Sequence, residues 1–297
     1  MKQLLSQGAI IAQGATRDRR YELHSILEEG FVYSLEDLQE HLVWKNTIAP
    51  LLSELPKNAK DIWQYGVTEM LNNAIDHSSG EHATINITKT LVHVDILIVD
   101  DGEGIFKKIK RELNLDDEYH SILELAKGKL TTDPDRHTGE GIFFSSRMFD
   151  RFGIFSGDLV FSHSSETDYD LFQSMGKNVQ GTGVAMSLKN NTARTTTQVF
   201  DSFSDKDYRF TKTIVPVRLA QYGDEMLISR SQAKRLLARF DKFKFVVLDF
   251  ECVDTIGQAF ADEVFRVFVR EHPEITLTWM NENPNVSRMI SRVRPSD

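Results

Sequence analysis

Apolar and polar positions along the chain follow two periods, one helical and one strand-like. The clearest helical period covers residues 62–77, and its apolar side consists of Trp63, Val67, Met70, Leu71, Ala74 and Ile75. Asp61 stands before this stretch, where an N-cap is expected, and Gly80 stands where helices commonly stop. The pattern predicts a helix from Ile62 to His77 that packs its apolar face into a core.

The polar side of the same predicted helix has an unusual composition. At about 100° per residue, Glu69, Asn73 and Asp76 fall within a narrow arc, and His77 lies beside them. Surface helices usually carry Lys and Glu pairs on this side. A carboxylate and a carboxamide one turn apart instead suit an activated water and a hard cation.

Strand-like patterns follow this helix. Residues 83–88 alternate, which predicts one wet face, whereas residues 92–99 are almost continuously apolar and are expected to be buried. The second of these runs into a glycine-containing stretch from Asp100 to Ile105. The charged segment 106–136 is weakly patterned, and we interpret it as too polar for a core.

The rest of the chain alternates strands and helices. A glycine motif at Gly139 and Gly141 leads into a helix through Met148, and residues 158–162 and 184–188 are strand-like. We interpret the polar run at 190–197 as a linker. Helices and strands alternate after it. The expected elements are a helix at 233–240, a strand at 245–250, a helix at 260–268, a strand at 275–279 and a helix at 286–293. The mixed residues 1–34 are expected to be an extension.

Composition narrows the class of protein. A length of 297 residues suggests two domains, and the net charge of −9 disfavours broad nucleic-acid binding. A single cysteine, Cys252, fits a reducing compartment. Because no apolar run reaches the roughly 20 residues of a membrane helix, we expect a cytoplasmic protein that makes no membrane contact.

Three motifs now occur in order, and together they resemble a known fold. Glu69-x3-Asn73-x2-Asp76-His77, Asp100-x-Gly102-x-Gly104 and Gly139-x-Gly141 are similar to the N, G1 and G2 boxes of the GHKL ATP-binding superfamily. That superfamily includes the gyrase B subunit, MutL, histidine kinases and anti-sigma-factor kinases. The resemblance implies an α+β fold: a two-layer α/β sandwich of the Bergerat type over residues 35–190, followed by a linker at 191–204.

The resemblance also implies roles for individual residues. Asp100 would accept a hydrogen bond from the adenine amino group, Asn73 would bind Mg²⁺, and Glu69 would activate water or serve phosphotransfer. Asp76 and His77 line the pocket floor or only hydrogen-bond locally. The other residues assigned to the nucleotide are Gly102, Gly104, Ile105, Lys129, His137, Thr138, Gly139, Gly141 and Thr182.

Residues 106–136 correspond in this resemblance to the nucleotide lid. Lys127 and Lys129 are candidates there for phosphate contact, although each is individually expected to be solvated. Asp101 stands where many relatives have Asn, which leaves the adenine contact intact.

The second half has a resemblance of its own. Residues 245–257 are similar to the core of STAS domains, which implies a smaller α/β domain over 205–297. Phosphorylated STAS antagonists carry Ser or Thr just before the glycine, whereas this chain has Ile256 before Gly257, and Thr255 is one place early. A phosphate-free interaction domain with a protein partner is therefore favoured.

Three functions remain open at this point. The first is an ATPase whose Mg-ATP state is signalled through the lid and the STAS-like domain. The second is a serine/threonine kinase acting on a separate STAS partner, and the third is a non-catalytic, ATP-gated interaction module. A histidine kinase is a weaker hypothesis, since no phosphoacceptor pattern surrounds His24, His41 or His120. A homodimer is open, because some branches of the fold dimerise on ATP.

Overall fold

The computed structural model describes residues 5, 8–14, 18–131, 138–165, 169–221 and 225–294. The chain forms two compact units of mixed α+β structure. The first unit comprises Met1–Ile105 with Ser145–Thr196, and the second comprises Phe106–Phe144 with Thr197–Asp297. The sequence places 106–144 inside the ATP-binding domain, whereas in the structure these residues cluster with the C-terminal part of the chain.

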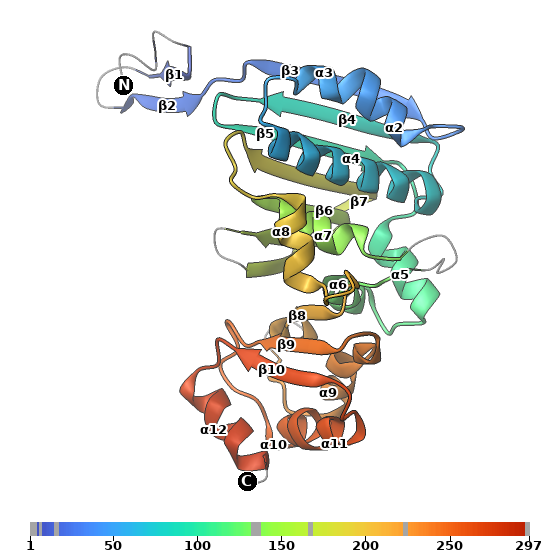
Figure 1. Ribbon diagram of the computed structural model, residues 1–297, viewed down its shortest axis with the longest axis vertical. Helices are drawn as coiled ribbons and strands as arrows, with labels where there is room; N and C mark the ends of the chain where they lie inside the picture. Colours follow the sequence, from blue (N-terminus) through green and yellow to red (C-terminus); the bar gives the residue numbers. More distant parts are fainter. Residues whose placement is uncertain are drawn as a thin grey trace. The chain divides into compact units, whose positions relative to one another are not determined.

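The first unit is built on a five-stranded antiparallel sheet in the order β3-β4-β5-β7-β6. Its elements are β1 (Ile10–Gln13), β2 (Arg20–Leu23), β3 (Leu27–Ser34), α2 (Glu40–Val43), a π-helix (Trp44–Ile48), α3 (Ala49–Leu51), α4 (Lys57–His77), β4 (His82–Lys89), β5 (His93–Asp100), β6 (Arg151–Ser164) and β7 (Tyr169–Lys189). Figure 1 shows α4 lying along one face of this sheet. The strand β3 falls in the region expected to be an extension, so the sheet begins earlier than the sequence pattern predicts.

The alternation of side chains explains the core face of the sheet. On β4, Ala83, Ile85 and Ile87 are buried and their neighbours are not, which confirms the predicted wet face. On β5, buried and half-buried positions alternate through Asp100. The expected continuous burial of β5 is wrong, because this strand has one face on the core although it pairs with β4 and β7 on both edges.

The helix α4 carries the predicted apolar face but has different ends. It starts at Lys57 after Pro56, and Asp61 lies inside it, where its carboxylate accepts from the Lys57 ammonium at 2.7 Å. Asp61 is therefore not the N-cap. At the other end, Ser79 adopts the left-handed conformation expected of Gly80, with φ of 59°.

A close contact fixes α4 against the sheet unit. A Cβ atom on Gly66 would collide with the ring of Phe149, which is fully buried. The Phe149 ring also packs on the Trp63 ring, with centroids 4.8 Å apart. The predicted core positions Trp63, Val67 and Met70 are all buried, and this glycine lets them approach the core.

The second unit contains a three-stranded parallel sheet in the order β10-β9-β8. Its elements are α5 (Ile105–Leu113), α6 (Glu118–Lys127), α7 (Gly141–Met148), α8 (Thr196–Phe203), β8 (Lys212–Pro216), 3-10 helices at Val217–Ala220 and Phe240–Lys242, α9 (Arg230–Leu237), β9 (Phe245–Asp249), α10 (Gln258–Asp262), a π-helix (Glu263–Phe268), α11 (Val269–Glu271), β10 (Thr276–Met280) and α12 (Pro284–Val293). The chain passes between the two units within α5, α7 and α8.

The helix α6 belongs to the core of the second unit. Every residue from His120 to Lys127 is buried, and α6 packs on β8 and on the 3-10 helix that follows it. The interpretation of residues 106–136 as too polar for a core is therefore wrong. Its charged residues Glu124 and Lys127 are buried as an ion pair with Nζ and Oε1 2.6 Å apart, a partnership that composition alone does not reveal.

Replacing Gly66 by alanine should destabilise the first unit. The added methyl group has to displace the Phe149 ring, which costs about 1–3 kcal/mol, against a gain in helix propensity of about 1 kcal/mol. Gly153→Ala is the matched control, since its Cβ would have no neighbour nearer than 3.7 Å. Urea unfolding followed by tryptophan fluorescence measures both variants; equal stability would contradict the packing described for α4.

Candidate functional site

The carboxylate of Asp100 is fixed at the carboxyl end of β5. Its Oδ1 accepts hydrogen bonds from the backbone N–H of Gly102 at 3.0 Å and of Thr182 at 3.2 Å. Thr182 pairs with Asp100 across the β5–β7 ladder, so the sheet itself supplies one of the two donors. The side chain is 7% exposed. Two backbone donors and the side chain of Thr182 therefore hold its orientation.

Burial changes the acidity of this carboxylate. Removal from water raises the pKa of Asp100 above the usual 3.8, while the hydrogen bonds from Gly102 and Thr182 act in the opposite direction. The charge of Asp101 next to it adds a smaller upward effect. The result is a fixed, poorly hydrated acceptor, which is the kind of group that can read an amino N–H of a ligand.

Three glycines make room for the backbone around Asp100. A Cβ on Gly102 would collide with the carbonyl of Ser78, and one on Gly181 would collide with the carbonyl of Asp100. Gly104 has φ of +91°, and its Cβ would stand 2.5 Å from Ser156 Oγ. Glycine is therefore needed at Gly104 and Gly181 for two reasons: both have positive φ, and both lie too close to neighbouring atoms for a Cβ.

Asp100, Gly102, Gly104, Gly181 and Thr182 together form what we call the Asp100 corner. Two further hydrogen bonds hold the backbone around it. Ser156 Oγ donates to the Gly181 carbonyl at 2.7 Å, and Thr182 Oγ1 accepts from the N–H of Ile105 at 3.0 Å. The structure thus brings together the predicted residues Asp100, Ile105 and Thr182. Ser156 was missed, because it lies on β6 about 50 residues from Gly104 and no local pattern marks it.

Asp101 has a different role from its neighbour. It is exposed, and its Oδ1 accepts from the N–H groups of Glu81 and His82 at 2.8 and 3.0 Å. Hydrogen bonds from His82 and Glu81 lower its pKa. The Oδ1 atom of Asp101 is therefore used to connect the loop after β5 to the start of β4.

The polar stripe of α4 ends next to this loop. The N–H of Glu103 donates to the carbonyl of Ser78 at 3.0 Å, directly after the last helical residue. With a rise of 1.5 Å per residue, Asn73 lies about 7 Å and Glu69 about 13 Å further along the helix axis. Glu69, Asn73 and His77 are half-buried, and Asp76 is exposed. The stripe and the Asp100 corner thus belong to one unit.

The remaining predicted site residues belong to the second unit. Gly139 has φ of +70° and packs on the backbone of Leu130, whose N–H donates to the Gly139 carbonyl at 3.1 Å. Thr138 is exposed, and Gly141 begins α7. His137 lies outside the described residues.

The two lysines of the predicted lid are engaged within the second unit. Lys129 Nζ donates to the carbonyl of Lys242 at 2.7 Å and lies 4.9 Å from the centroid of the Phe243 ring. Burial lowers the pKa of Lys129. Lys127 is completely buried, so the expectation that it is solvated or touches phosphate is wrong.

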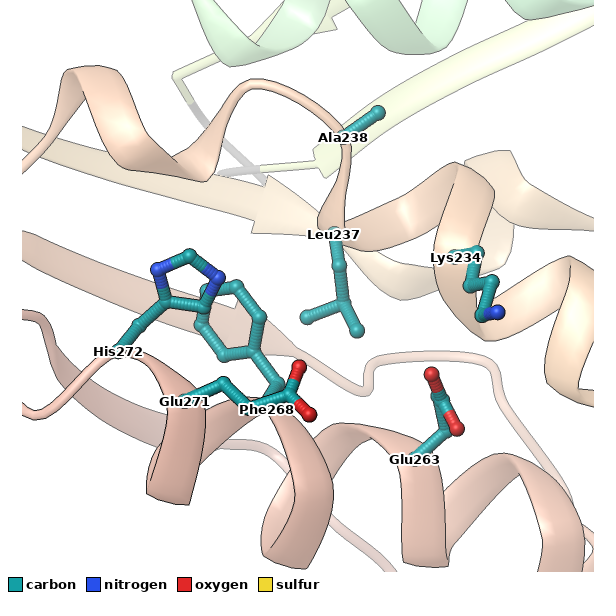
Figure 2. A pocket seen from close by; sticks show the side chains of 7 residues that line it. All are labelled: Lys234, Leu237, Ala238, Glu263, Phe268, Glu271 and His272. Atoms are coloured by element: carbon teal, nitrogen blue, oxygen red, sulfur yellow. The ribbon is translucent and has the colours of Figure 1, made fainter.

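A shallow hollow of about 240 Å³ lies elsewhere on the second unit. Figure 2 shows the charged groups of Lys234, Glu263 and Glu271 placed around Leu237. The ring of Phe268 packs on that of His272, with centroids 4.5 Å apart. None of the predicted site residues lines this hollow.

Comparison with known proteins identifies the C-terminal part. A family model described as "STAS-like domain of unknown function (DUF4325)" matches residues 232–287. The chain carries a STAS-like domain. No curated protein matches the chain. In the described part of the chain, no helix is long and apolar enough to cross a membrane.

The residue before the glycine of the STAS-like domain is a core residue. Ile256 is 1% exposed and forms a bridge with Leu227, and the N–H of Gly257 donates to the Leu227 carbonyl at 2.7 Å. The position that carries Ser or Thr in phosphorylated STAS antagonists is thus an apolar contact here. Thr255, one residue earlier, is half-buried.

Two substitutions at Asp100 separate its structural role from its charge. Asp100→Ala leaves the N–H groups of Gly102 and Thr182 without their acceptor and should cost about 1–3 kcal/mol in free energy of unfolding. Asp100→Asn keeps the acceptor oxygen and removes a poorly hydrated charge, so its stability at pH 7.5 should equal or exceed that of the wild type.

The pH dependence follows from the raised pKa of Asp100. As pH falls through that pKa towards 3.8, the folded protein takes up a proton before the unfolded chain does. The wild type should therefore gain stability relative to Asp100→Asn in this window, as measured by urea unfolding at several pH values. A wild type that loses stability relative to Asp100→Asn there would contradict the burial of this charge.

Proposed function

We propose that the chain is a Mg²⁺-dependent ATP-binding regulatory protein of the GHKL type that hydrolyses ATP. The observation that carries this proposal is the buried carboxylate of Asp100, whose Oδ1 is held by two backbone N–H groups. A carboxylate in this state is costly to bury. A ligand amino group that donates to it gives a functional reason for that cost.

The adenine amino group is the donor that we assign to Asp100. Both backbone hydrogen bonds to this carboxylate fall on Oδ1, and we assign Oδ2 to the base. Gly102 packs against Ser78 and Gly104 against Ser156, and neither position has room for a side chain, so the loop that follows Asp100 has a fixed course beside the base that we assign there. The resemblance of these residues to the G1 box supports the same assignment.

The stripe on α4 supports a nucleotide that runs along the helix. Asn73 lies nearer to the Ser78–Glu103 contact than Glu69 does. An extended nucleotide with its base at Asp100 would meet the metal-binding group first and the water-activating group next, in the same order. Asn73 Nδ2 is directed at Met70 Sδ, 4.0 Å away, and we assign its oxygen to the metal. Bound Mg²⁺ would neutralise phosphate charge.

The side chains present suit Mg²⁺ better than a transition metal. Among the described residues, no three His, Cys, Asp or Glu side chains gather as a metal site would require. Mg²⁺ takes most of its ligands from phosphates and water, so one carboxamide oxygen is enough. The contacts of Gly139, Gly141 and Lys129 with phosphate stay predictions, since these residues belong to the second unit.

A protein kinase is the second function that we retain. The buried Ile256 disfavours phosphorylation at the usual position of this chain's own STAS-like domain, so a kinase would need a Ser or Thr on a separate STAS partner. The third function, ATP as a ligand without turnover, predicts the same binding residues and no phosphate release.

Asp100→Asn should weaken ATP binding. The substitution turns an acceptor oxygen towards the base into a donor nitrogen, which should raise the Kd by about 10- to 100-fold. Asp95→Asn is the matched control on the same strand; its carboxylate is half-buried and pairs with His93 at 2.9 Å. Isothermal titration calorimetry with Mg-ATP measures both. Unchanged affinity in Asp100→Asn would show that the base lies elsewhere.

Glu69→Gln should abolish phosphate release and leave ATP binding intact. Loss of a general base lowers the rate by about 100- to 10,000-fold, whereas the neutral amide preserves the shape of the side chain. Asp61→Asn, on the exposed part of the same helix, is the control and should keep the wild-type rate.

The same assay separates the three functions. Phosphate release by the wild type supports hydrolysis, and binding without release contradicts it. Transfer of labelled γ-phosphate to a STAS protein, without release to water, would favour the kinase.

A further inference from the structure

The buried ammonium of Lys127 joins α6 to the end of α9. Its Nζ donates to Glu124 Oε1 at 2.6 Å and to the carbonyls of Arg235 and Ala238 at 3.0 and 2.9 Å. The last two are carbonyl groups at the carboxyl end of α9, where the helix dipole favours a cation. Lys127 itself is 0% exposed, so all three of its donor positions are used inside the protein.

Arg239 completes this cluster from the STAS-like domain. Its guanidinium donates to Glu124 Oε2 at 2.7 Å and to the carbonyls of Gly128 and Lys129 at 3.0 and 2.6 Å. Arg239 adopts the left-handed conformation, with φ of 64°, which is uncommon for a residue with a side chain. A fourth acceptor is the carbonyl of Glu124 at 3.2 Å. The left-handed backbone and these four acceptors indicate that this arginine is placed specifically.

The buried charges of Glu124, Lys127 and Arg239 are costly for the folded state. Removing two cations and a carboxylate from water is expensive, and apolar residues of similar size often stabilise such a position as well or better. The neighbouring residues Ile122, Leu123 and Leu125 already supply apolar packing for α6. The hydrogen bonds of this cluster are directional, and they join α6 to the carboxyl end of α9 and to Arg239.

The cluster is connected to the glycine motif through a short segment. Arg239 holds the carbonyls of Gly128 and Lys129, and the next residue, Leu130, pairs with Gly139 through the hydrogen bond described above. A Cβ on Gly139 would collide with the backbone of Leu130, so the two backbones pack directly against each other. Gly139 is therefore connected to Arg239 by an unbroken series of contacts through Leu130, Lys129 and Gly128.

We propose that Glu124, Lys127 and Arg239 form a polar latch that couples the occupancy of the Gly139–Gly141 motif to the STAS-like domain. The inference rests on the proposed function, since it names how the nucleotide state is signalled. Phosphate at the motif would hold Gly139 and Leu130 in place, and the latch would pass this restraint to the carboxyl end of α9. Residues 118–130 of the predicted lid segment would then respond to nucleotide together with the STAS-like domain.

Arg239→Gly tests the latch with little backbone cost, because glycine accepts the left-handed conformation. Tyr208→Gly is the matched control: it also has positive φ, at 58°, and its side chain is 84% exposed. Hydrogen–deuterium exchange is followed in the full chain for residues 118–130 and 230–249, without nucleotide and with Mg-ATP. Calorimetry on the same samples reports whether nucleotide binds.

We expect Mg-ATP to slow exchange in 230–249 by about 5-fold or more in the wild type and in Tyr208→Gly. Arg239→Gly should bind Mg-ATP with a Kd within about 3-fold of the wild type, yet lose this slowing. Full retention of the slowing in Arg239→Gly would overturn the latch. So would a wild type that binds Mg-ATP without any change in exchange at 230–249, and in that case the proposed function stands.

Failure of the proposed function has a separate signature. A wild type that binds no Mg-ATP overturns the function and the coupling together. Faster exchange of residues 118–130 in nucleotide-free Arg239→Gly would then still support the docking role of the cluster, and unchanged exchange would overturn that role as well.

Discussion

The first unit depends on one constraint: the Asp100 carboxylate is anchored by backbone N–H groups from its own loop and from the neighbouring strand β7. This anchor requires the loop to turn tightly, which is why Gly102 and Gly181 have no room for a Cβ. The tight loop in turn brings Glu103 against the end of α4. One buried carboxylate thus helps to hold the end of β5, where we place the adenine, next to the end of α4. That helix carries Asn73, the proposed metal ligand, and Glu69, the proposed general base.

The second unit depends on a different kind of contact. Here a segment inserted between β5 and β6 supplies α6, and this helix packs on β8 next to a STAS-like fold. The STAS-like family model begins at residue 232, so α6 and β8 lie outside the matched region. In the second unit of this chain, the STAS-like fold and the predicted lid segment share one core.

Local pattern predicted the elements with strong periodicity. The apolar face of α4, the alternation on β4 and the strands and helices of the C-terminal part follow from side-chain spacing, and the structure confirms them within a few residues. The stripe of Glu69 and Asn73 and the corner of Asp100 could be proposed from motifs because each lies on a short stretch of chain. The misses have a common cause. The burial of Lys127, the partnership of Arg239 with Glu124 and the role of Ser156 depend on residues 25 to 115 positions away, and a window of sequence contains no trace of them.

We propose above that Asp100 binds the amino group of adenine. Calorimetric titration of the wild-type chain with Mg-ATP and with Mg-GTP tests it most directly, because guanine presents a carbonyl oxygen where adenine presents the amino group. We expect binding of ATP and at least about 10-fold weaker binding of GTP, which is the order of a lost hydrogen bond at a buried acceptor. Equal affinity for the two nucleotides, or no binding of either, would contradict it.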